Sequence, residues 1–317
     1  MQGDYAHHLA RLHAGFEAPD ELIAAAARAV SASPIAGKRR IVHGEANEVY
    51  ALALESGLEV ILRIARRADG LFEKERWAID RCRALGMRVP QVFSTGRYDV
   101  AGESLDVCVL EKLAGERLSD SLALPRQTLE KVVRQLGEQL SRLHSIRADD
   151  LGEGARFFAN DTDDFLAIEA EFVELGVAAG LDPAGLGRAF RFFEATMAGH
   201  AALPRSLTHN DLRACHVLVH DGELSGLIDF GEASIDSPIN EFAKWDFWEG
   251  EALPTRWLEE GYAGKSLFAE GYGEVFAALR LANALWALRW YALTGYPAGA
   301  ERAKTRLSGY MAGLGLV

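Results

Sequence analysis

The chain is poor in cysteine, and its basic residues are outnumbered by acidic ones. Its three cysteines (Cys82, Cys108 and Cys215) form neither an even set nor a Cys-x-x-Cys spacing. This pattern argues against a disulfide framework or a structural zinc site and predicts a reducing, cytoplasmic location. The 34 Lys and Arg residues face 46 Asp and Glu residues, which gives a formal net charge of −12. Because a nucleic-acid partner requires a basic surface, this balance argues against that class of partner.

Long apolar runs are also missing. The N-terminal residues carry charged and histidine side chains where a secretory signal needs an apolar block, so we expect no export signal. The most apolar late segment, residues 275–293, is interrupted by Arg280 and Arg289. It therefore falls short of the roughly 20 apolar residues that a membrane span needs. We predict a buried helix there and no membrane partner.

The order of the predicted elements indicates two lobes. With 317 residues, 49% of them hydrophobic and 25% charged, the chain has the composition of a globular protein and the length for two lobes. A first helix is predicted to begin with Asp20 as its cap and to run to about Val30. Strand-like runs follow at residues 40–42, 49–54, 59–64, 90–93 and 105–113, with one helix at 71–85. Beyond residue 118, helices are predicted at 129–144, 164–179 and 183–197. We therefore predict an α+β, bilobal fold with a strand-rich N-lobe (residues 1–114) and a mainly helical C-lobe (residues 115–317).

The most informative segment is residues 208–233, which read THNDLRACHVLVHDGELSGLIDFGEA. Asp211 lies two positions after His209, and His216 directly precedes the apolar run 217–219. An Asp-Gly pair at 221–222 predicts a hairpin turn, and a second apolar run ends at Asp229. This layout is typical of a kinase catalytic loop followed by a hairpin and a metal-binding aspartate. It predicts phosphoryl transfer, with Asp211 and Asp229 meeting over one cleft.

The chemistry of phosphoryl transfer suggests a role for each of these side chains. Asp211 is placed to orient a substrate hydroxyl or to accept its proton. Asp229 is expected to bind the Mg²⁺ that bridges the nucleotide phosphates. His216 stands where a kinase loop normally has Asn, and its nitrogen matches Mg²⁺ less well than an oxygen does. It therefore either binds the metal or hydrogen-bonds a water or phosphate. His209 is expected to shape the loop.

Nucleotide-binding residues are predicted in the N-lobe. Residues 42–50, which include Gly44 and Asn47, form either a turn whose N–H groups cradle phosphate or an ordinary hairpin turn. Arg63, on a predicted strand, is a cation for the same cleft, and Glu75 on the next helix is its expected partner. The alternative is an exposed pair of little energetic value. The last strand ends at Glu111 to Leu113, whose backbone groups are expected to face a purine edge.

An acidic segment follows Asp229. It contains Glu232, Asp236, Glu241, Asp246, Glu249, Glu251, Glu259 and Glu260, with only Lys244 and Arg256 nearby in the sequence. Either these carboxylates are a solvated face or they attract a cationic substrate. Trp245, Phe247 and Trp248 alternate with them and suit either a substrate pocket or a helical core. The predicted substrate-binding set is Glu232, Asp236, Glu241, Trp245 and Asp246.

These motifs resemble the aminoglycoside phosphotransferase family, small-molecule kinases with a protein-kinase-like fold, from about residue 42 to residue 243. The resemblance implies that Asp211 is the catalytic base, that His216 and Asp229 hold Mg²⁺, that Arg63 contacts phosphate, and that Glu75 braces Arg63. His216 in place of Asn is similar to the subset with macrolide kinases and 2''-aminoglycoside kinases, some of which favour GTP. Two positions depart from the family pattern: Arg63 replaces a lysine, and Glu241 stands where Asp is more usual.

The predicted activity is transfer of phosphate from ATP or GTP to a hydroxyl of a small, cationic molecule such as an aminoglycoside-like or macrolide antibiotic. Two alternatives stay open. One is a metabolic kinase for a sugar or amino alcohol, because the family also covers choline and homoserine kinases. The other is a nucleotide-binding pseudokinase without transfer activity. A monomer and a homodimer are both compatible with the sequence.

Overall fold

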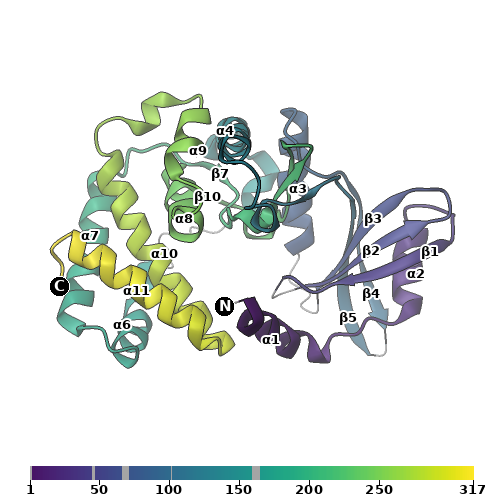
Figure 1. The fold of residues 1–317 in the computed structure, drawn as a ribbon, viewed down its shortest axis with the longest axis horizontal. Helices are drawn as coiled ribbons and strands as arrows, with labels where there is room; N and C mark the ends of the chain where they lie inside the picture. The colour runs from purple at the N-terminus through teal and green to yellow at the C-terminus, as the bar shows by residue number, and fades with distance from the viewer. Residues whose placement is uncertain (1, 45–46, 66–70, 101, 159–164) are drawn as a thin grey trace. The chain divides into compact units, whose positions relative to one another are not determined.

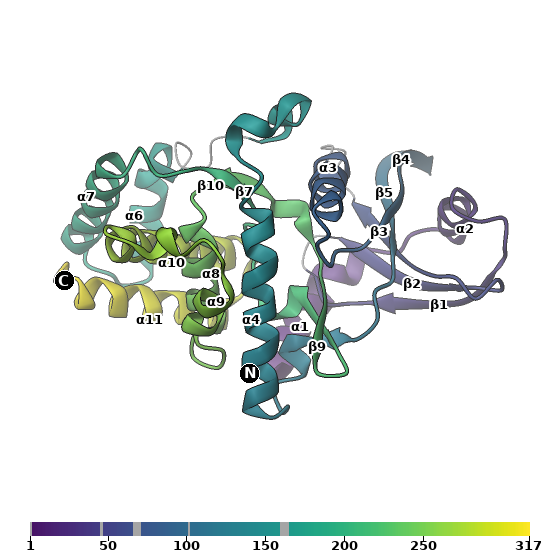
Figure 2. The same ribbon diagram turned by 90° about the horizontal axis from the view of Figure 1, so that it is seen from above.

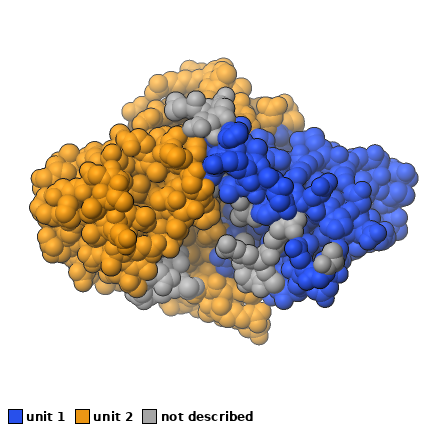
Figure 3. All heavy atoms as spheres, turned by 90° about the horizontal axis from the view of Figure 1, so that it is seen from below, with its two compact units in different colours: residues 1–115, 225–231 blue, residues 116–224, 232–317 orange. Residues whose placement is uncertain are grey.

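The computed structural model describes residues 2–44, 47–65, 71–100, 102–158 and 165–317. The chain forms two compact units (Figure 3). Unit 1 contains Met1–Gly115 and the later segment Ser225–Gly231, and unit 2 contains Glu116–Leu224 and Glu232–Val317. The first division follows Gly115, whereas the sequence analysis placed the lobe boundary after residue 114. The return of residues 225–231 to unit 1 was not predicted.

Unit 1 is built on one five-stranded antiparallel sheet with the order β1-β2-β3-β5-β4 (Figure 1). Its elements are α1 (Gln2–Leu12), η1 (His13–Gly15), α2 (Asp20–Arg28), β1 (Ile35–Ile41), β2 (Glu48–Leu54), β3 (Glu59–Ala65), α3 (Leu71–Ala84), β4 (Val92–Val100) and β5 (Glu103–Glu111). Every strand predicted in this part of the chain is present, and most are longer than the apolar runs that indicated them.

The core of unit 1 lies between α2 and the sheet. Alternate residues of β2 (Tyr50, Leu52 and Leu54) are buried, as expected for a strand with one face in a core. Leu22 and Ile23 of α2 join the same cluster. Burial of an aliphatic side chain of this size contributes about 1.5–3 kcal/mol, so this face holds the helix in place.

Two details of unit 1 differ from the sequence prediction. Strand β1 begins at Ile35, five residues earlier than expected, because the polar residues 38–40 pair with β2 through their backbone. Asp20 does not cap α2, since the cap position is Pro19 and has no side-chain hydrogen bond. Instead, Asp20 forms an exposed ion pair with Lys38 on β1.

Unit 2 is mainly helical. Its helices are α4 (Arg126–Leu143), α6 (Glu169–Ala178), α7 (Pro183–Gly199), α8 (Ile239–Glu249), α9 (Thr255–Gly261), α10 (Tyr272–Thr294) and α11 (Pro297–Gly313). The shorter elements are β6 (Glu116–Arg117), η2 (Leu118–Asp120), η3 (Ala148–Asp150), η4 (Gly152–Phe157), β7 (Ser206–Thr208), η5 (Ala214–His216), β8 (Val217–His220), β9 (Glu223–Leu227), η6 (Phe230–Glu232), β10 (Ser234–Asp236) and η7 (Lys265–Phe268). The chain passes from unit 2 into unit 1 within β9 and returns within η6.

Helix α10 is the centre of unit 2. It packs against α6, α7, α8 and α11, which Figure 2 shows grouped around it. Its apolar residues are buried on several sides, as the sequence predicted for residues 275–293. No helix in the described parts of the chain is long and apolar enough to cross a membrane. The predicted helix at 164–179 appears as α6 from Glu169, and its expected start at Asp164 lies outside the described residues.

Candidate active site

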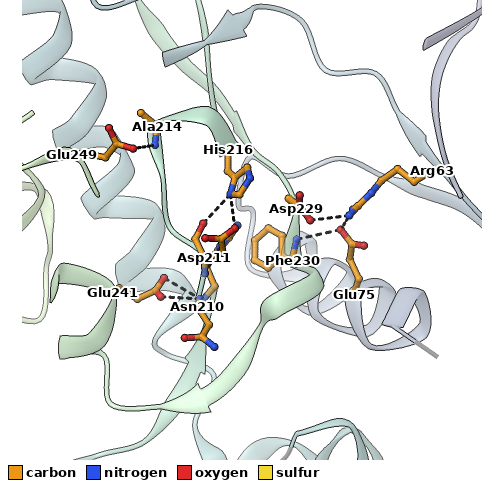
Figure 4. A network of polar contacts seen from close by, with 11 residues as sticks. Arg63, Glu75, Asn210, Asp211, Ala214, His216, Asp229, Phe230, Glu241 and Glu249 are labelled. Atoms are coloured by element: carbon orange, nitrogen blue, oxygen red, sulfur yellow. Dashed lines mark hydrogen bonds and ion pairs between the residues drawn. The ribbon is translucent and has the colours of Figure 1, made fainter. Parts of the chain in front are cut away.

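The loop that carries Asp211 begins where β7 ends, and β7 is paired with β10. Asn210 has φ +62°, a left-handed conformation that Asn tolerates better than most residues. The loop is held by Glu241 of α8, whose carboxylate accepts the N–H groups of His209 (3.1 Å) and Asn210 (2.9 Å) (Figure 4). The Nδ1 atom of buried His209 accepts the N–H of Asp211 at 3.3 Å, so His209 shapes the loop as expected.

His216 lies against Asp211 (Figure 4). Its Nδ1 is 2.8 Å from the backbone oxygen of Asp211 and 3.5 Å from the Oδ2 atom of the same residue. Because a carbonyl oxygen only accepts, Nδ1 carries the hydrogen and donates it. The neutral ring then has its lone pair on Nε2, which is the atom that a metal ion or a hydrogen-bond donor would use.

The hairpin after this loop is formed as predicted. Asp221 and Gly222 both have positive φ (+51° and +74°). The tight two-residue hairpin turn requires this conformation at both positions, which is why Asp-Gly pairs are favoured there. At the end of the hairpin, Asp229 also has positive φ (+68°). A non-glycine residue in this conformation is uncommon, and such strain is typical of functional sites.

The segment that carries Asp229 is held on unit 1 by backbone and side-chain contacts. The N–H of Leu227 donates to the carbonyl of Arg88 at 2.8 Å, and the hydroxyl of Ser225 donates to the carbonyl of Ala114 at 2.7 Å. A Cβ at Gly226 would lie 2.3 Å from Cδ1 of Leu113. A side chain at position 226 would therefore force the Leu113 side chain to move, and the predicted residue Leu113 packs against this segment.

Buried Arg63 and Glu75 form a charge network with the partly exposed Asp229 in unit 1 (Figure 4). Arg63 donates through Nη1 to Glu75 and through Nη2 to Oδ1 of Asp229, the latter at 2.8 Å. Glu75 also accepts the N–H of Phe230 at 3.1 Å. Burial opposes the charge of Arg63, but the carboxylates of Asp229 and Glu75 outweigh it, so the pKa of Arg63 lies above its usual value. The Arg63–Glu75 pair is thus a buried contact, in contrast to the exposed alternative that the sequence left open.

The other predicted nucleotide-binding residues lie elsewhere in unit 1. Gly44 is exposed, and its carbonyl oxygen is 2.6 Å from Nε2 of His13. Asn47 is buried, and residues 45–46 of the predicted phosphate loop lie outside the described residues. The N–H of Glu111 donates to the carbonyl of Gln91 at 2.8 Å. The Glu111 amide is thus bound to the segment before β4, and the role of residues 111–113 in facing a purine stays a prediction.

Three of the predicted substrate-binding residues, Asp236, Glu241 and Trp245, are buried. The side chains of Glu241 and Trp245 are fully enclosed. Glu241 holds the loop, and the indole Nε1 of Trp245 donates to the carbonyl of Leu253 at 2.9 Å. The structure therefore corrects the expectation that they contact a substrate directly. Burial raises the pKa of Glu241 to about 7 despite the two backbone donors.

Most of the other carboxylates of the acidic segment have internal partners, and Glu232 lies at an exposed position. Asp236 is buried and accepts from the Ser237 N–H and the Asn240 side chain, both at 2.6 Å. Asp246 pairs with Arg280 at 3.0 Å. Glu251 pairs with Arg306, and Glu260 pairs with Arg134. Sequence proximity had suggested only Lys244 and Arg256 as counter-charges, whereas the fold supplies arginines from α4, α10 and α11.

A residue that the sequence analysis missed as a site residue is Glu249, at the end of α8. Its Oε1 accepts the N–H of Ala214 at 2.9 Å, in the same loop that carries Asp211 (Figure 4). Its spacing from Glu241, about two helical turns, was the only available signal, and it was hidden among the many acidic residues of the segment.

The donor chemistry of the predicted metal ligands fits Mg²⁺ unequally. The carboxylate of Asp229, whose side chain is 39% exposed, offers the hard oxygen that Mg²⁺ prefers. His216 offers a nitrogen, which is a poorer match. Among the described residues, no three or more His, Cys, Asp or Glu side chains gather in a metal-binding group.

Comparison with known proteins identifies the class. The fold is that of small-molecule phosphotransferases: a thermostable mutant of aminoglycoside phosphotransferase APH(4)-Ia, apo form, matches with a TM-score of 0.67 at 21% identity, covering 88% of this chain and 95% of that one. The GDP complex of wild-type aminoglycoside 2'-phosphotransferase-IIIa matches with a TM-score of 0.70 at 19% identity, covering 92% and 98%. The family model of the phosphotransferase enzyme family matches residues 38–279. The chain belongs to this family, which confirms the predicted family and fold class.

Two curated relatives are similar over part of the chain. Homoserine kinase from Hyphomonas neptunium (strain ATCC 15444) is 30% identical over 159 residues, or 48% of this chain and 47% of the relative. Hygromycin-B 4-O-kinase from Escherichia coli is 24% identical over 220 residues, or 66% of this chain and 61% of the relative. The matched regions thus span less than two thirds of either relative.

Proposed function

We propose that this protein transfers the γ-phosphoryl group of ATP or GTP to a hydroxyl group of a small molecule. The observation that carries the proposal is the fastened loop around Asp211, in which Glu241, His209 and His216 all bind the backbone of residues 209–211. A carboxylate held in a rigid loop suits the task of orienting an attacking hydroxyl.

Asp211 is the group that hydrogen-bonds the acceptor hydroxyl and takes its proton as the phosphoryl group is transferred. General-base assistance of this kind contributes about 10²–10⁴-fold to the rate. His216 donates through Nδ1 to the Asp211 carbonyl, which holds the backbone of the base in position. With the hydrogen on Nδ1, the Nε2 lone pair would coordinate a metal ion or accept a hydrogen bond from a water.

Asp229 is the residue that we propose would hold Mg²⁺, and for His216 a metal-binding role is what the family resemblance implies. When bound, Mg²⁺ would neutralise negative charge on the nucleotide phosphates. Arg63 keeps the Asp229 carboxylate oriented, and Glu75 keeps Arg63 in place. Arg63 is also the cation of unit 1 that we assign to the nucleotide phosphates, with Gly44 and Asn47 in the adjoining loop.

The acceptor that we favour is an aminoglycoside-like antibiotic. The support is the similarity to the hygromycin-B 4-O-kinase and to the fold of solved aminoglycoside phosphotransferases. Glu232, exposed on unit 2, is the carboxylate that we assign to a cationic acceptor, and Asp236 and Asp246 are the further acidic residues of the predicted set.

A second candidate is a metabolic acceptor, such as an amino alcohol or a sugar. Two observations favour it. The carboxylates of the acidic segment are largely engaged by arginines and amides of the same unit, which leaves less negative charge for a polycation. In addition, the chain is 30% identical to a homoserine kinase over about half its length.

An acceptor panel decides between these candidates. The purified protein is incubated with Mg²⁺, ATP or GTP, and aminoglycosides, macrolides, amino alcohols or sugars, and both nucleoside diphosphate and the phosphorylated product are measured. The proposal predicts product with one chemical class and none with the Asp211→Asn variant. No phosphorylated product with any hydroxyl compound would contradict it.

A further inference from the structure

The loop that carries Asp211 contacts α8 at two places. At its start, the N–H groups of His209 and Asn210 donate to Glu241. At its other end, the buried residue Ala214 donates its N–H to Oε1 of Glu249 at 2.9 Å. One helix thus holds the loop before and after Asp211.

The second contact is reinforced by the residue next to Ala214. The guanidinium of Arg213 lies 4.3 Å from the ring centroid of Trp248, which directly precedes Glu249. A cation over an indole face at this distance is a favourable contact. Two consecutive loop residues therefore dock on two consecutive residues of α8, one through its side chain and one through its backbone.

In the sequence, the residues of this second contact lie between Asp211 and His216, the two side chains that the proposed chemistry uses. Arg213 and Ala214 are within three residues of Asp211, and Ala214 begins the short helix η5 that ends at His216. Because His216 is bound to the Asp211 carbonyl, a displacement of Ala214 changes both positions together. Loss of the Glu249 acceptor also leaves a buried N–H unpaired, which favours a different loop conformation.

We propose that Glu249 and Trp248 are positioning residues that set the orientation of Asp211 and His216 by docking Arg213 and Ala214 on α8. The proposal rests on the phosphotransferase function proposed above. In this proposal Glu249 does not contact the substrate. Its effect depends on one carboxylate oxygen, which accepts the backbone N–H of Ala214.

The variants separate this role from general stability. Glu249→Ala removes the acceptor, whereas Glu249→Gln keeps an oxygen that can accept the Ala214 N–H. Glu251→Ala is the matched control, because Glu251 follows two residues later, its side chain is 84% exposed, and it pairs with Arg306 at the surface. Arg213→Ala removes the contact between the Arg213 guanidinium and the Trp248 ring without changing a residue of α8.

The first measurement does not depend on activity. Hydrogen exchange is followed by mass spectrometry in peptides that cover residues 209–216. We expect exchange about five- to tenfold faster in Glu249→Ala, as loss of one hydrogen bond to a buried group allows, and wild-type exchange in Glu249→Gln and Glu251→Ala. Equal exchange in Glu249→Ala and Glu251→Ala would overturn the proposal. If Glu249→Ala fails to fold, Arg213→Ala gives the same comparison.

The second measurement is steady-state kinetics with the acceptor found in the panel. We expect kcat to fall about ten- to a hundredfold in Glu249→Ala, the effect of a misplaced catalytic group, while the KM for the nucleotide changes less than about twofold. Glu249→Gln is expected to restore most of kcat. An unchanged kcat in Glu249→Ala together with faster loop exchange would also overturn the proposal. A wild-type protein with no transfer activity would instead refute the proposed function, and the exchange data would still decide whether α8 holds the loop.

Discussion

The guanidinium of Arg63 holds the carboxylate of Asp229, with 2.8 Å between Nη2 and Oδ1, while its Nη1 binds Glu75. A planar guanidinium can bind two carboxylates in fixed directions, which a single ammonium group does less well. Arginine at this position therefore joins the segment that carries Asp229 to the helix that carries Glu75. This explains how a residue that departs from the usual lysine still fits the site.

Removal of Arg63 should destabilise the protein strongly. In Arg63→Met, the buried carboxylate of Glu75 loses its counter-charge, and a loss of about 3–5 kcal/mol in the free energy of unfolding is expected. Urea unfolding measures this change. The control is Arg97→Met, which breaks the partly exposed pair with Asp106 on the same sheet and should cost much less than Arg63→Met. Equal costs would mean that the Arg63 network contributes no more than a surface pair.

Glu241 should give the stability a specific pH dependence. Its pKa is raised to about 7 in the folded protein, above the ordinary value of 4.5. The folded chain then binds more protons than the unfolded chain between these pH values. The stability from this group is present below about pH 4.5 and is lost as pH rises through about 7. Relative to Glu241→Gln, the wild type should lose on the order of 3 kcal/mol between pH 4.5 and pH 8.

The comparison with Glu241→Gln is needed because other groups titrate in the same range. Burial and the charge of Arg147 lower the pKa of His144 to about 3, so its contribution has the opposite sign and is lost as the pH falls below about 6.5. This contribution is common to both proteins and cancels in the difference. A difference that does not change with pH would show that Glu241 is ionised normally.

A chain of buried amides should couple α10 to the loop. Asn283 of α10 donates to Asn240 at 3.1 Å, and Asn240 donates to Asp236 at 2.6 Å and to the Oδ1 atom of Asn210 at 3.4 Å. In a double-mutant cycle of Asn240→Ala and Asn283→Ala, we expect a coupling energy of about 0.5–3 kcal/mol from denaturant unfolding. Additive effects of the two substitutions would argue against a shared network.

The contact between α4 and α9 should tolerate no side chain at Gly137. A Cβ there would lie 2.2 Å from the carbonyl oxygen of Leu258, a backbone atom that cannot move alone. Gly137→Ala is expected to cost about 1–3 kcal/mol through overpacking, measured by thermal unfolding. Gly309→Ala in α11 is the control, because a Cβ there meets nothing within 4 Å and should stabilise the helix by up to about 1 kcal/mol. Similar effects of both substitutions would mean that the two helices are not in close contact.

Local patterns were sufficient to predict much of the fold. The alternation in β2, the apolar face of α4 and the Asp-Gly turn at 221–222 each depend on residues close in sequence, and each was found where expected. The position of residues 225–231 in unit 1 was not predictable in this way. It depends on contacts with Arg88, Ala114 and Leu113, more than a hundred residues earlier.

In the candidate site, too, local sequence patterns predicted some features, whereas contacts between residues far apart in the sequence were seen only in the fold. The pattern of the motif predicts Asp211, His216 and Asp229 as site residues, because their order and spacing are typical of a kinase catalytic loop. The pattern could not distinguish a carboxylate that faces substrate from one that holds the backbone. Glu241 and Glu249 are both acidic residues in an acidic segment, and only the fold shows that each accepts a backbone N–H group of the loop.

The most direct test of the account is phosphoryl transfer by Asp211→Asn under saturating nucleotide and acceptor. The substitution keeps the size of the side chain and removes the base. The account predicts that nucleotide affinity stays within about twofold of the wild type while kcat falls about 10²–10⁴-fold. Transfer at the wild-type rate by Asp211→Asn would contradict the central claim that this carboxylate activates the acceptor hydroxyl.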